Sequence, residues 1–167
     1  MIRHLLLVRH AKSSWADTRL ADAQRPLNAR GQRDAPIMAA RATQLMPQPD
    51  VLISSPALRA AQTAEVFAQA WGLGKAAIQW EPRIYEAHTG MLQSIVELLP
   101  DAHQKVVAFG HNPGFTSLAN VLAKDYVTEN LPTCGMVLLA FQAGRWQDVE
   151  TGSGELLAYE TPKNQKA

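Results

Sequence analysis

Two short stretches of the sequence place a histidine beside groups that can hold an anion. Arg9 and His10 directly follow the apolar run Leu5–Val8, and His111 and Asn112 follow a second apolar run that ends near residue 109. A guanidinium group offers a planar fork of donors to a phosphate, and a neutral imidazole with one free nitrogen can attack phosphorus. These residue types, each at the end of an apolar run, point to phosphoryl-transfer chemistry.

Two further charged residues could complete such a site. Arg59 lies in the first turns of a helix that we expect to open at Ser55-Pro56, and it would bring a second guanidinium group to the phosphate. Glu86 follows a short strand expected at 77–80. Its carboxyl group could donate a proton to a leaving group, or it could form an ion pair with Arg9 or Arg59.

The apolar pattern predicts strands that alternate with helices. Strands are expected at 2–8, 51–54, 77–80, 105–109 and 135–141, followed by a hairpin of 146–150 with 156–159. Helices are expected at 31–46, from 55 to about 71, at 91–99 and at 113–122, whereas 11–29 has no steady period and is expected to be a loop. This alternation is typical of an α/β fold with a mainly parallel central sheet flanked by helices. Ligands bind at the carboxyl ends of such strands, so we expect the charged groups above to meet there.

The motifs at these strand ends resemble those of a known family. Three of them, Val8-Arg9-His10-Ala11, Ser54-Ser55-Pro56-x-x-Arg59-x-x-x-Thr63 and Gly110-His111-Asn112-Pro113, look like the histidine phosphatase superfamily. Within it, Arg9-His10-Ala11-Lys12-Ser13 and Gly110-His111-Asn112-Pro113-Gly114 are similar to the SixA-type phosphohistidine phosphatases. The resemblance implies a three-layer, phosphoglycerate mutase-like sandwich.

The resemblance also implies a role for each matching residue. His10 would attack phosphorus and carry the phosphoryl group as phosphohistidine, while Arg9, Arg59 and His111 surround the phosphoryl oxygens. Glu86 stands near the position of the family's proton donor. No metal and no cofactor is implied. The residues expected to bind substrate are Arg9, Arg59, His111, Asn112 through its turn and backbone N–H, and Arg25, which lies in a loop that the family places near its pocket.

The sequence departs from the wider superfamily in ways that bear on the substrate. Ala11 stands where many members have glycine, and Ala16 stands near a phosphate-contacting asparagine of phosphoglycerate mutases. The segment 72–105 is expected to hold only one strand and one helix, which leaves a minimal cap and an open site. We therefore expect the substrate to be phosphohistidine in a protein, such as a phosphorelay carrier in signal transduction.

Two alternatives remain open at this stage. One is a phosphatase of small phosphate monoesters. The other is a module that binds a phosphoprotein without turning it over, although the presence of two histidines argues against it, because arginine alone serves pure phosphate binding better. Lys12 and Ser14 could line the mouth of the site, but a solvated loop is the simpler interpretation.

Composition sets the remaining expectations. The 167 residues fit one domain, 1–167, and a net charge of +1 does not favour a nucleic-acid partner. The single Cys134 permits no internal disulfide, and no arginine follows closely enough for a cysteine phosphatase, so it is expected in the core. The short apolar run before Arg9 is not a signal peptide, and no run has transmembrane length. We expect a cytoplasmic monomer with no membrane partner.

Overall fold

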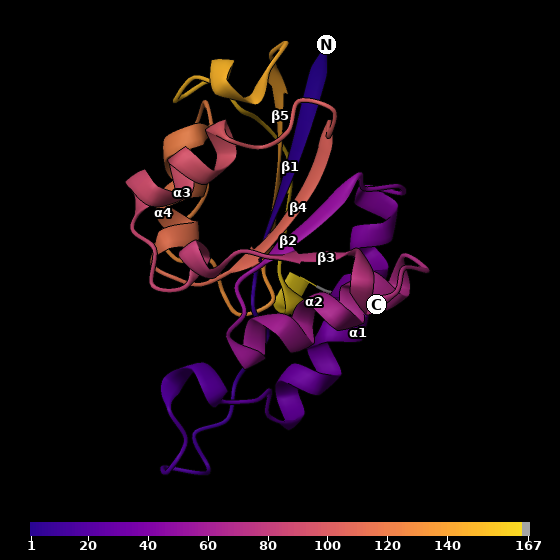
Figure 1. The fold of residues 1–167 in the computed structure, drawn as a ribbon, viewed down its shortest axis with the longest axis vertical. Helices are drawn as coiled ribbons and strands as arrows, with labels where there is room; N and C mark the ends of the chain where they lie inside the picture. The colour runs from indigo at the N-terminus through magenta and orange to yellow at the C-terminus, as the bar shows by residue number, and fades with distance from the viewer. Residues whose placement is uncertain (165–167) are drawn as a thin grey trace.

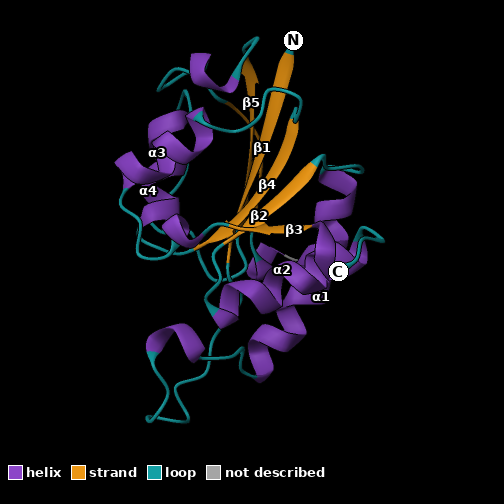
Figure 2. Ribbon diagram, viewed as in Figure 1, coloured by secondary structure: helices purple, strands orange, loops and turns teal. Residues whose placement is uncertain are grey.

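The computed structural model describes residues 1–164 and contains one six-stranded sheet (Figure 2). The strand order is β3-β2-β4-β1-β5-β6, in which β1 to β4 are mutually parallel and β5 and β6 are antiparallel. The strands are β1 (Ile2–Arg9), β2 (Val51–Ser54), β3 (Ile78–Trp80), β4 (Lys105–Gly110), β5 (Met136–Gln142) and β6 (Glu155–Glu160). The predicted α/β class with a mainly parallel sheet is confirmed.

Helices cover both faces of this sheet (Figure 1). α1 (Ala29–Leu45) and α2 (Leu58–Ala70) pack on one face, and α3 (Thr89–Glu97) and α4 (Gly114–Leu122) pack on the other. The period of two along β1 explains both layers, because successive side chains of a strand point to opposite faces. Leu5 and Leu7 enter the core under α3 and α4, whereas Leu6 and Val8 enter the core under α1 and α2. Cys134 belongs to the second core, as expected.

The long segment between β1 and α1 is a loop, as predicted, with one short 3-10 helix, η1 (Asp22–Gln24). It is tied back on itself by a bridge between Ser13 and Leu27, and the N–H of Asn28 donates to the carbonyl of Lys12 at 2.9 Å. The loop lies directly against α1 at Gly31, where an added Cβ would stand 2.2 Å from the Lys12 carbonyl oxygen. Glycine is therefore required at this crossing.

Two expectations about local structure are wrong. α2 begins at Leu58 rather than at Ser55, because the Ser55 hydroxyl accepts from the Ala57 N–H at 3.2 Å in a turn before the helix. The predicted strand at 146–150 is instead a 3-10 helix, η4 (Trp146–Asp148). Buried Trp146 donates its indole N–H to the His103 carbonyl, which anchors this segment outside the sheet, and β6 pairs with β5.

The remaining elements agree with the sequence pattern to within a few residues. Among residues 1–164, no helix has the length and apolar content needed to cross a membrane. Part of the predicted polar tail, residues 165–167, lies outside the described residues.

Candidate active site

The carboxyl ends of three neighbouring strands bring the predicted motifs together. Arg9 at the end of β1 is in register with Gly110 of β4, and Ser54 at the end of β2 is in register with Phe109. His10 and His111, which follow β1 and β4, therefore lie side by side, with ring centroids 5.3 Å apart. The prediction that distant segments converge at this edge is confirmed for these two histidines.

The imidazole of His10 is buried and is held in one tautomer. Its Nδ1 lies 2.8 Å from the carbonyl oxygen of Ala11. Because a carbonyl oxygen only accepts, Nδ1 carries the proton and Nε2 has a free lone pair. The Ala11 N–H in turn donates to the Thr63 hydroxyl at 3.0 Å, and that hydroxyl donates to the Arg59 carbonyl at 2.8 Å. The imidazole of His10 is thus fixed through a chain of hydrogen bonds that ends on α2.

Arg59 contacts Nε2 of His10, and the charge of Arg9 also acts on the imidazole. Arg59 projects from the first turn of α2, is almost fully buried, and donates from Nε toward Nε2 of His10 at 3.4 Å. Arg9 donates from Nη1 to the Leu131 carbonyl at 2.9 Å, while its buried Nε has no hydrogen-bond partner. Burial, together with the charge of Arg59, lowers the pKa of Arg9. The strand ends therefore bring two guanidinium groups close to His10.

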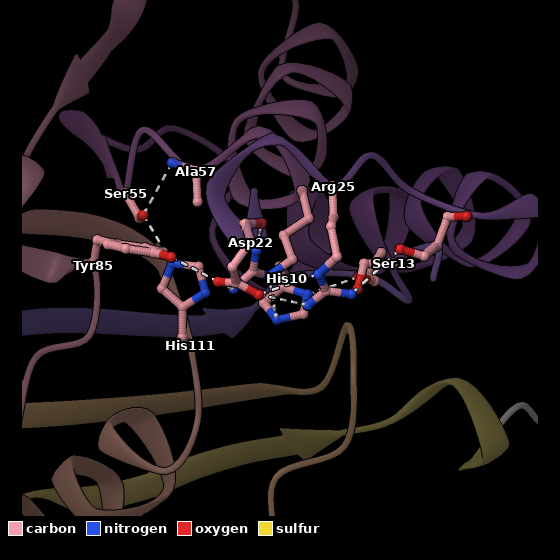
Figure 3. Close-up of polar contacts among 11 residues, drawn as sticks. His10, Ser13, Asp22, Arg25, Ser55, Ala57, Tyr85 and His111 are labelled. Carbon is pink, nitrogen blue, oxygen red and sulfur yellow. Dashed lines mark hydrogen bonds and ion pairs between the residues drawn. The ribbon is translucent and has the colours of Figure 1, made fainter. Parts of the chain in front are cut away.

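His111 is held differently from His10. Its Nε2 lies 2.8 Å from the hydroxyl of Ser55, and its buried Nδ1 has no hydrogen-bond partner (Figure 3). Ser55 itself is fully buried and accepts the Ala57 N–H, which fixes the direction of its hydroxyl group. The residue expected as a helix cap is thus a positioning residue for the second histidine.

Both imidazoles are neutral near pH 7. Burial, reinforced by the nearby cations, lowers the pKa of His10 to about 3, although the hydrogen bond to Ala11 opposes the shift. Burial and the charge of Arg59 lower the pKa of His111 to about 4. A neutral imidazole with a free Nε2 is the form that can act as a nucleophile.

Asp22 is a site residue that the sequence did not reveal. Its Oδ2 accepts from the Tyr85 hydroxyl at 2.6 Å and from Nη2 of Arg59 at 3.0 Å, and its Oδ1 accepts from Nε of Arg25 at 3.1 Å (Figure 3). The backbone carbonyl of Asp22 also accepts from Nη1 of Arg59 at 2.8 Å. The hydrogen bond from Tyr85, together with both arginines, lowers the pKa of Asp22 to about 2, so its carboxylate is ionised.

Arg25 lies in the loop beside the site, as the resemblance implies. Its Nη1 donates to the Ser13 hydroxyl at 2.8 Å and its guanidinium group stacks 3.5 Å over the ring of Trp15, which is exposed. Through Asp22, Arg25 is connected to Arg59.

Two of the predicted residues are placed in ways that change the expectation. Glu86 is exposed and has a left-handed backbone with φ of 56°. Of its two possible roles, the ion pair with Arg9 or Arg59 does not form among the described residues, and Arg59 pairs with Asp22 instead. The side chain of Asn112 donates to Asn130 and to the Leu131 carbonyl. Its oxygen accepts twice from Thr116. Asn112 thus braces a neighbouring loop and its side chain offers no spare donor.

The hydrogen bonds of Lys12 and Ser14 hold the loop together, and within residues 1–164 none of them involves His10 or His111. The Ser14 hydroxyl accepts from the Ala16 N–H at 3.0 Å, and its carbonyl lies 3.4 Å from Nη1 of Arg25. Within the part of the chain that the structure describes, no three His, Cys, Asp or Glu side chains gather as metal ligands would.

Comparison with known proteins places this geometry in a family. A model of the histidine phosphatase superfamily (branch 1) matches residues 5–124, more than half of the chain and every motif described above. The chain belongs to the histidine phosphatase superfamily. An uncharacterized protein of Mycobacterium tuberculosis is 32% identical over 165 residues, which cover 93% of this chain and 100% of that protein. An uncharacterized chloroplastic protein of Arabidopsis thaliana is 33% identical over 161 residues, which cover 91% of this chain and 72% of that protein.

Solved structures give the same assignment at the level of the fold. SixA from Agrobacterium tumefaciens superposes with a TM-score of 0.80 at 25% identity, over 96% of this chain and 98% of that one. A protein histidine phosphatase SixA complexed with tungstate superposes with a TM-score of 0.82 at 19% identity, over 98% of this chain and 99% of that one. The mycobacterial glucosyl-3-phosphoglycerate phosphatase Rv2419c superposes with a TM-score of 0.67 at 14% identity, over 90% of this chain and 96% of that one. The SixA-type, phosphoglycerate mutase-like fold predicted for this histidine phosphatase from its motifs is confirmed.

Proposed function

We propose that this histidine phosphatase forms a covalent phosphohistidine at His10 and acts on phosphohistidine in a protein, such as a phosphorelay carrier. One observation carries the proposal. Because Nδ1 of neutral His10 donates to Ala11, the lone pair is on Nε2, which faces Nε of Arg59 at 3.4 Å, and the charge of Arg9 also acts on this imidazole. A neutral nucleophile surrounded by cations suits attack on an anionic phosphoryl group.

The reaction would proceed in two steps. In the first, Nε2 of His10 bonds to phosphorus as the P–N bond of the substrate breaks, and the electron pair leaves with the substrate imidazole, which takes a proton from water. In the second, water attacks the phosphorus on His10, the new P–N bond breaks, and inorganic phosphate leaves. Arg9 and Arg59 would stabilise the charge on the phosphoryl oxygens in both transition states. Because a P–N bond is labile, the exposed Glu86 is not required as an acid.

The shape of the molecule supports a protein substrate. Between β3 and β4 the chain contains only the 3-10 helix η3 (Pro82–Ile84) and α3, and α3 packs beside α4 on the face of the sheet rather than over the strand ends (Figure 1). No element of that segment forms a cap domain over the site. The similarity to SixA proteins supports the same substrate class.

The test compares phosphate release from a phosphohistidine-bearing protein with release from small phosphate monoesters, using the wild type and His10→Ala. We expect the wild type to prefer the phosphoprotein, and His10→Ala to lose turnover by more than about 10³-fold, as when a nucleophile is removed. His103→Ala is the matched control, because the contacts of His103 with Trp146 and Arg3 use its backbone carbonyl. An alkaline quench should trap labelled phosphate on the wild type and not on His10→Ala.

Each alternative has its own outcome. Faster phosphate release from small monoesters would identify a small-molecule phosphatase. The mycobacterial glucosyl-3-phosphoglycerate phosphatase has the same fold as this chain. Binding of the phosphoprotein without any phosphate release would identify a recognition module. Unchanged turnover in His10→Ala would show that His10 is not the nucleophile.

A further inference from the structure

Asp22 places a carboxylate in a site that is otherwise built to attract an anion. Its two oxygens accept from the Tyr85 hydroxyl, Nη2 of Arg59 and Nε of Arg25 at 2.6, 3.0 and 3.1 Å. Three donors converging on one anionic group form the same arrangement that would hold the oxygens of a phosphoryl group. Arg59 is also the arginine that contacts His10.

We propose that Asp22 is an internal anion that occupies the cationic groups of the free protein, and that a phosphoryl group must displace it from Arg59 to bind. Asp22 would then determine how tightly the site holds a phosphoryl oxyanion. The inference rests on the proposed phosphoryl-binding role of Arg59 and adds a residue that weakens binding rather than strengthening it.

The structure makes Asp22 the partner that can move. Its side chain is 46% exposed, whereas the side chain of Arg59 is 8% exposed. Asp22 lies on η1, a single turn in which no residue is buried, and this turn sits in the loop that projects below α1 and α2 (Figure 1). The carboxylate can therefore turn toward water without disturbing core packing, while the guanidinium group of Arg59 stays fixed next to His10.

Electrostatics gives the displacement its direction. The carboxylate of Asp22 is ionised, since hydrogen bonds from Tyr85 and Arg59 lower its pKa to about 2. Two anions that compete for one guanidinium group repel each other, so a bound phosphoryl group and a paired Asp22 exclude one another. The carboxylate of Asp22 would therefore weaken the binding of inorganic phosphate, and this would favour release of the product.

The test measures binding of inorganic phosphate by calorimetry at pH 7.5 to the wild type, Asp22→Asn and Asp17→Asn. Asp17→Asn is the matched control, because Asp17 lies in the same loop and pairs only with exposed Arg19 among the described residues. We expect Asp22→Asn to bind phosphate about 5- to 30-fold more tightly than the wild type. This gain corresponds to one or two charge-assisted hydrogen bonds from Arg59 for which phosphate no longer competes with a carboxylate. Asp17→Asn should bind within about twofold of the wild type, because exposed ion pairs contribute little.

The outcomes separate this inference from the function on which it rests. Equal or weaker binding by Asp22→Asn would overturn it and show that the carboxylate positions Arg59. Equal gains in both variants would also overturn it, since net charge alone would then explain the effect. If no variant and no wild-type protein binds phosphate, the proposed phosphoryl site itself is wrong. Asp22→Ala should change affinity in the same direction as Asp22→Asn, and urea unfolding of each variant checks that the fold is kept.

Discussion

The hydroxyl of Thr63 ties the loop of His10 to α2, and its removal should reduce both stability and turnover. Thr63→Val keeps the shape of the side chain but loses the acceptor for the Ala11 N–H at 3.0 Å and the donor to the Arg59 carbonyl at 2.8 Å. Thr63 and Ala11 are both fully buried, so water cannot replace the lost partner. The Ala11 carbonyl, which fixes the tautomer of His10, would lose its support.

The magnitude follows from the unsatisfied backbone N–H. A buried donor without a partner costs about 1–3 kcal/mol, and we expect the free energy of unfolding to fall by that amount. The same loss of order at His10 should lower kcat/KM about 10- to 100-fold, because about 1.4 kcal/mol corresponds to a factor of ten in rate. Thr63→Ser, which keeps the hydroxyl and deletes one methyl group, should lose only about 0.5–1.5 kcal/mol and keep most of the activity.

Urea unfolding gives the stability of both variants, and phosphate release gives the rate. A third measurement isolates the tautomer: the ¹⁵N shifts of His10 should report a protonated Nδ1 in the wild type and in Thr63→Ser, and a mixture of tautomers in Thr63→Val. If Thr63→Val unfolds at the same urea concentration as Thr63→Ser and releases phosphate at the same rate, the chain from α2 to the nucleophile does not act as argued.

Further changes test the rest of the site. Arg59→Ala should lower kcat about 10²–10³-fold, as loss of an oxyanion donor does; a loss below threefold would place Arg59 outside the site. Ser55→Ala removes the partner of His111 at 2.8 Å and should lower kcat about tenfold, with no loss of folded protein by circular dichroism. Gly31→Ala would place Cβ 2.2 Å from the Lys12 carbonyl and should cost about 1–3 kcal/mol in urea unfolding, unlike Gly74→Ala, which meets nothing within 4 Å. The two active-site histidines titrate near pH 6.5 when unfolded but at about 3 and about 4 when folded. The unfolded chain therefore takes up more protons as the pH falls below 6.5, and stability should drop toward pH 4 by up to about 1.4 kcal/mol per pH unit and histidine. A variant in which both histidines are glutamine should lose less stability between pH 7 and pH 5.

Much of the fold could be predicted because it depends on short-range patterns. The continuous apolar run Leu5–Val8 implies a strand covered on both faces, and the structure places two separate cores on those faces. Pro47 and Gly72 follow their helices as stop signals do. The strand-end rule was enough to bring Arg9 and His111 together, although the order of strands in the sheet was not known.

The missed residues depend on contacts that no local pattern encodes. Asp22 lies in a loop without periodicity, and its hydrogen bond with Tyr85 joins residues 63 positions apart. Its position is decided by how the loop folds back through Ser13 and Leu27. The error at Ser55 has a related cause, since a serine before a proline is a good helix-capping signal but its hydroxyl here serves His111.

Without the family resemblance, residue type and spacing could not distinguish the two histidines, since each follows an apolar strand and each is followed by residues suited to a turn. The structure separates them by which ring nitrogen is held. In His10 the carbonyl of Ala11 engages Nδ1, and the lone pair on Nε2 meets the long contact from Nε of Arg59 at 3.4 Å. In His111 the Ser55 hydroxyl engages Nε2 at 2.8 Å, and Nδ1 is the nitrogen without a partner in the described part of the chain. The two imidazoles therefore present different nitrogens to the site: Nε2 of His10 faces Arg59, whereas His111 has its Nε2 engaged by Ser55 and its Nδ1 without a partner among the described residues.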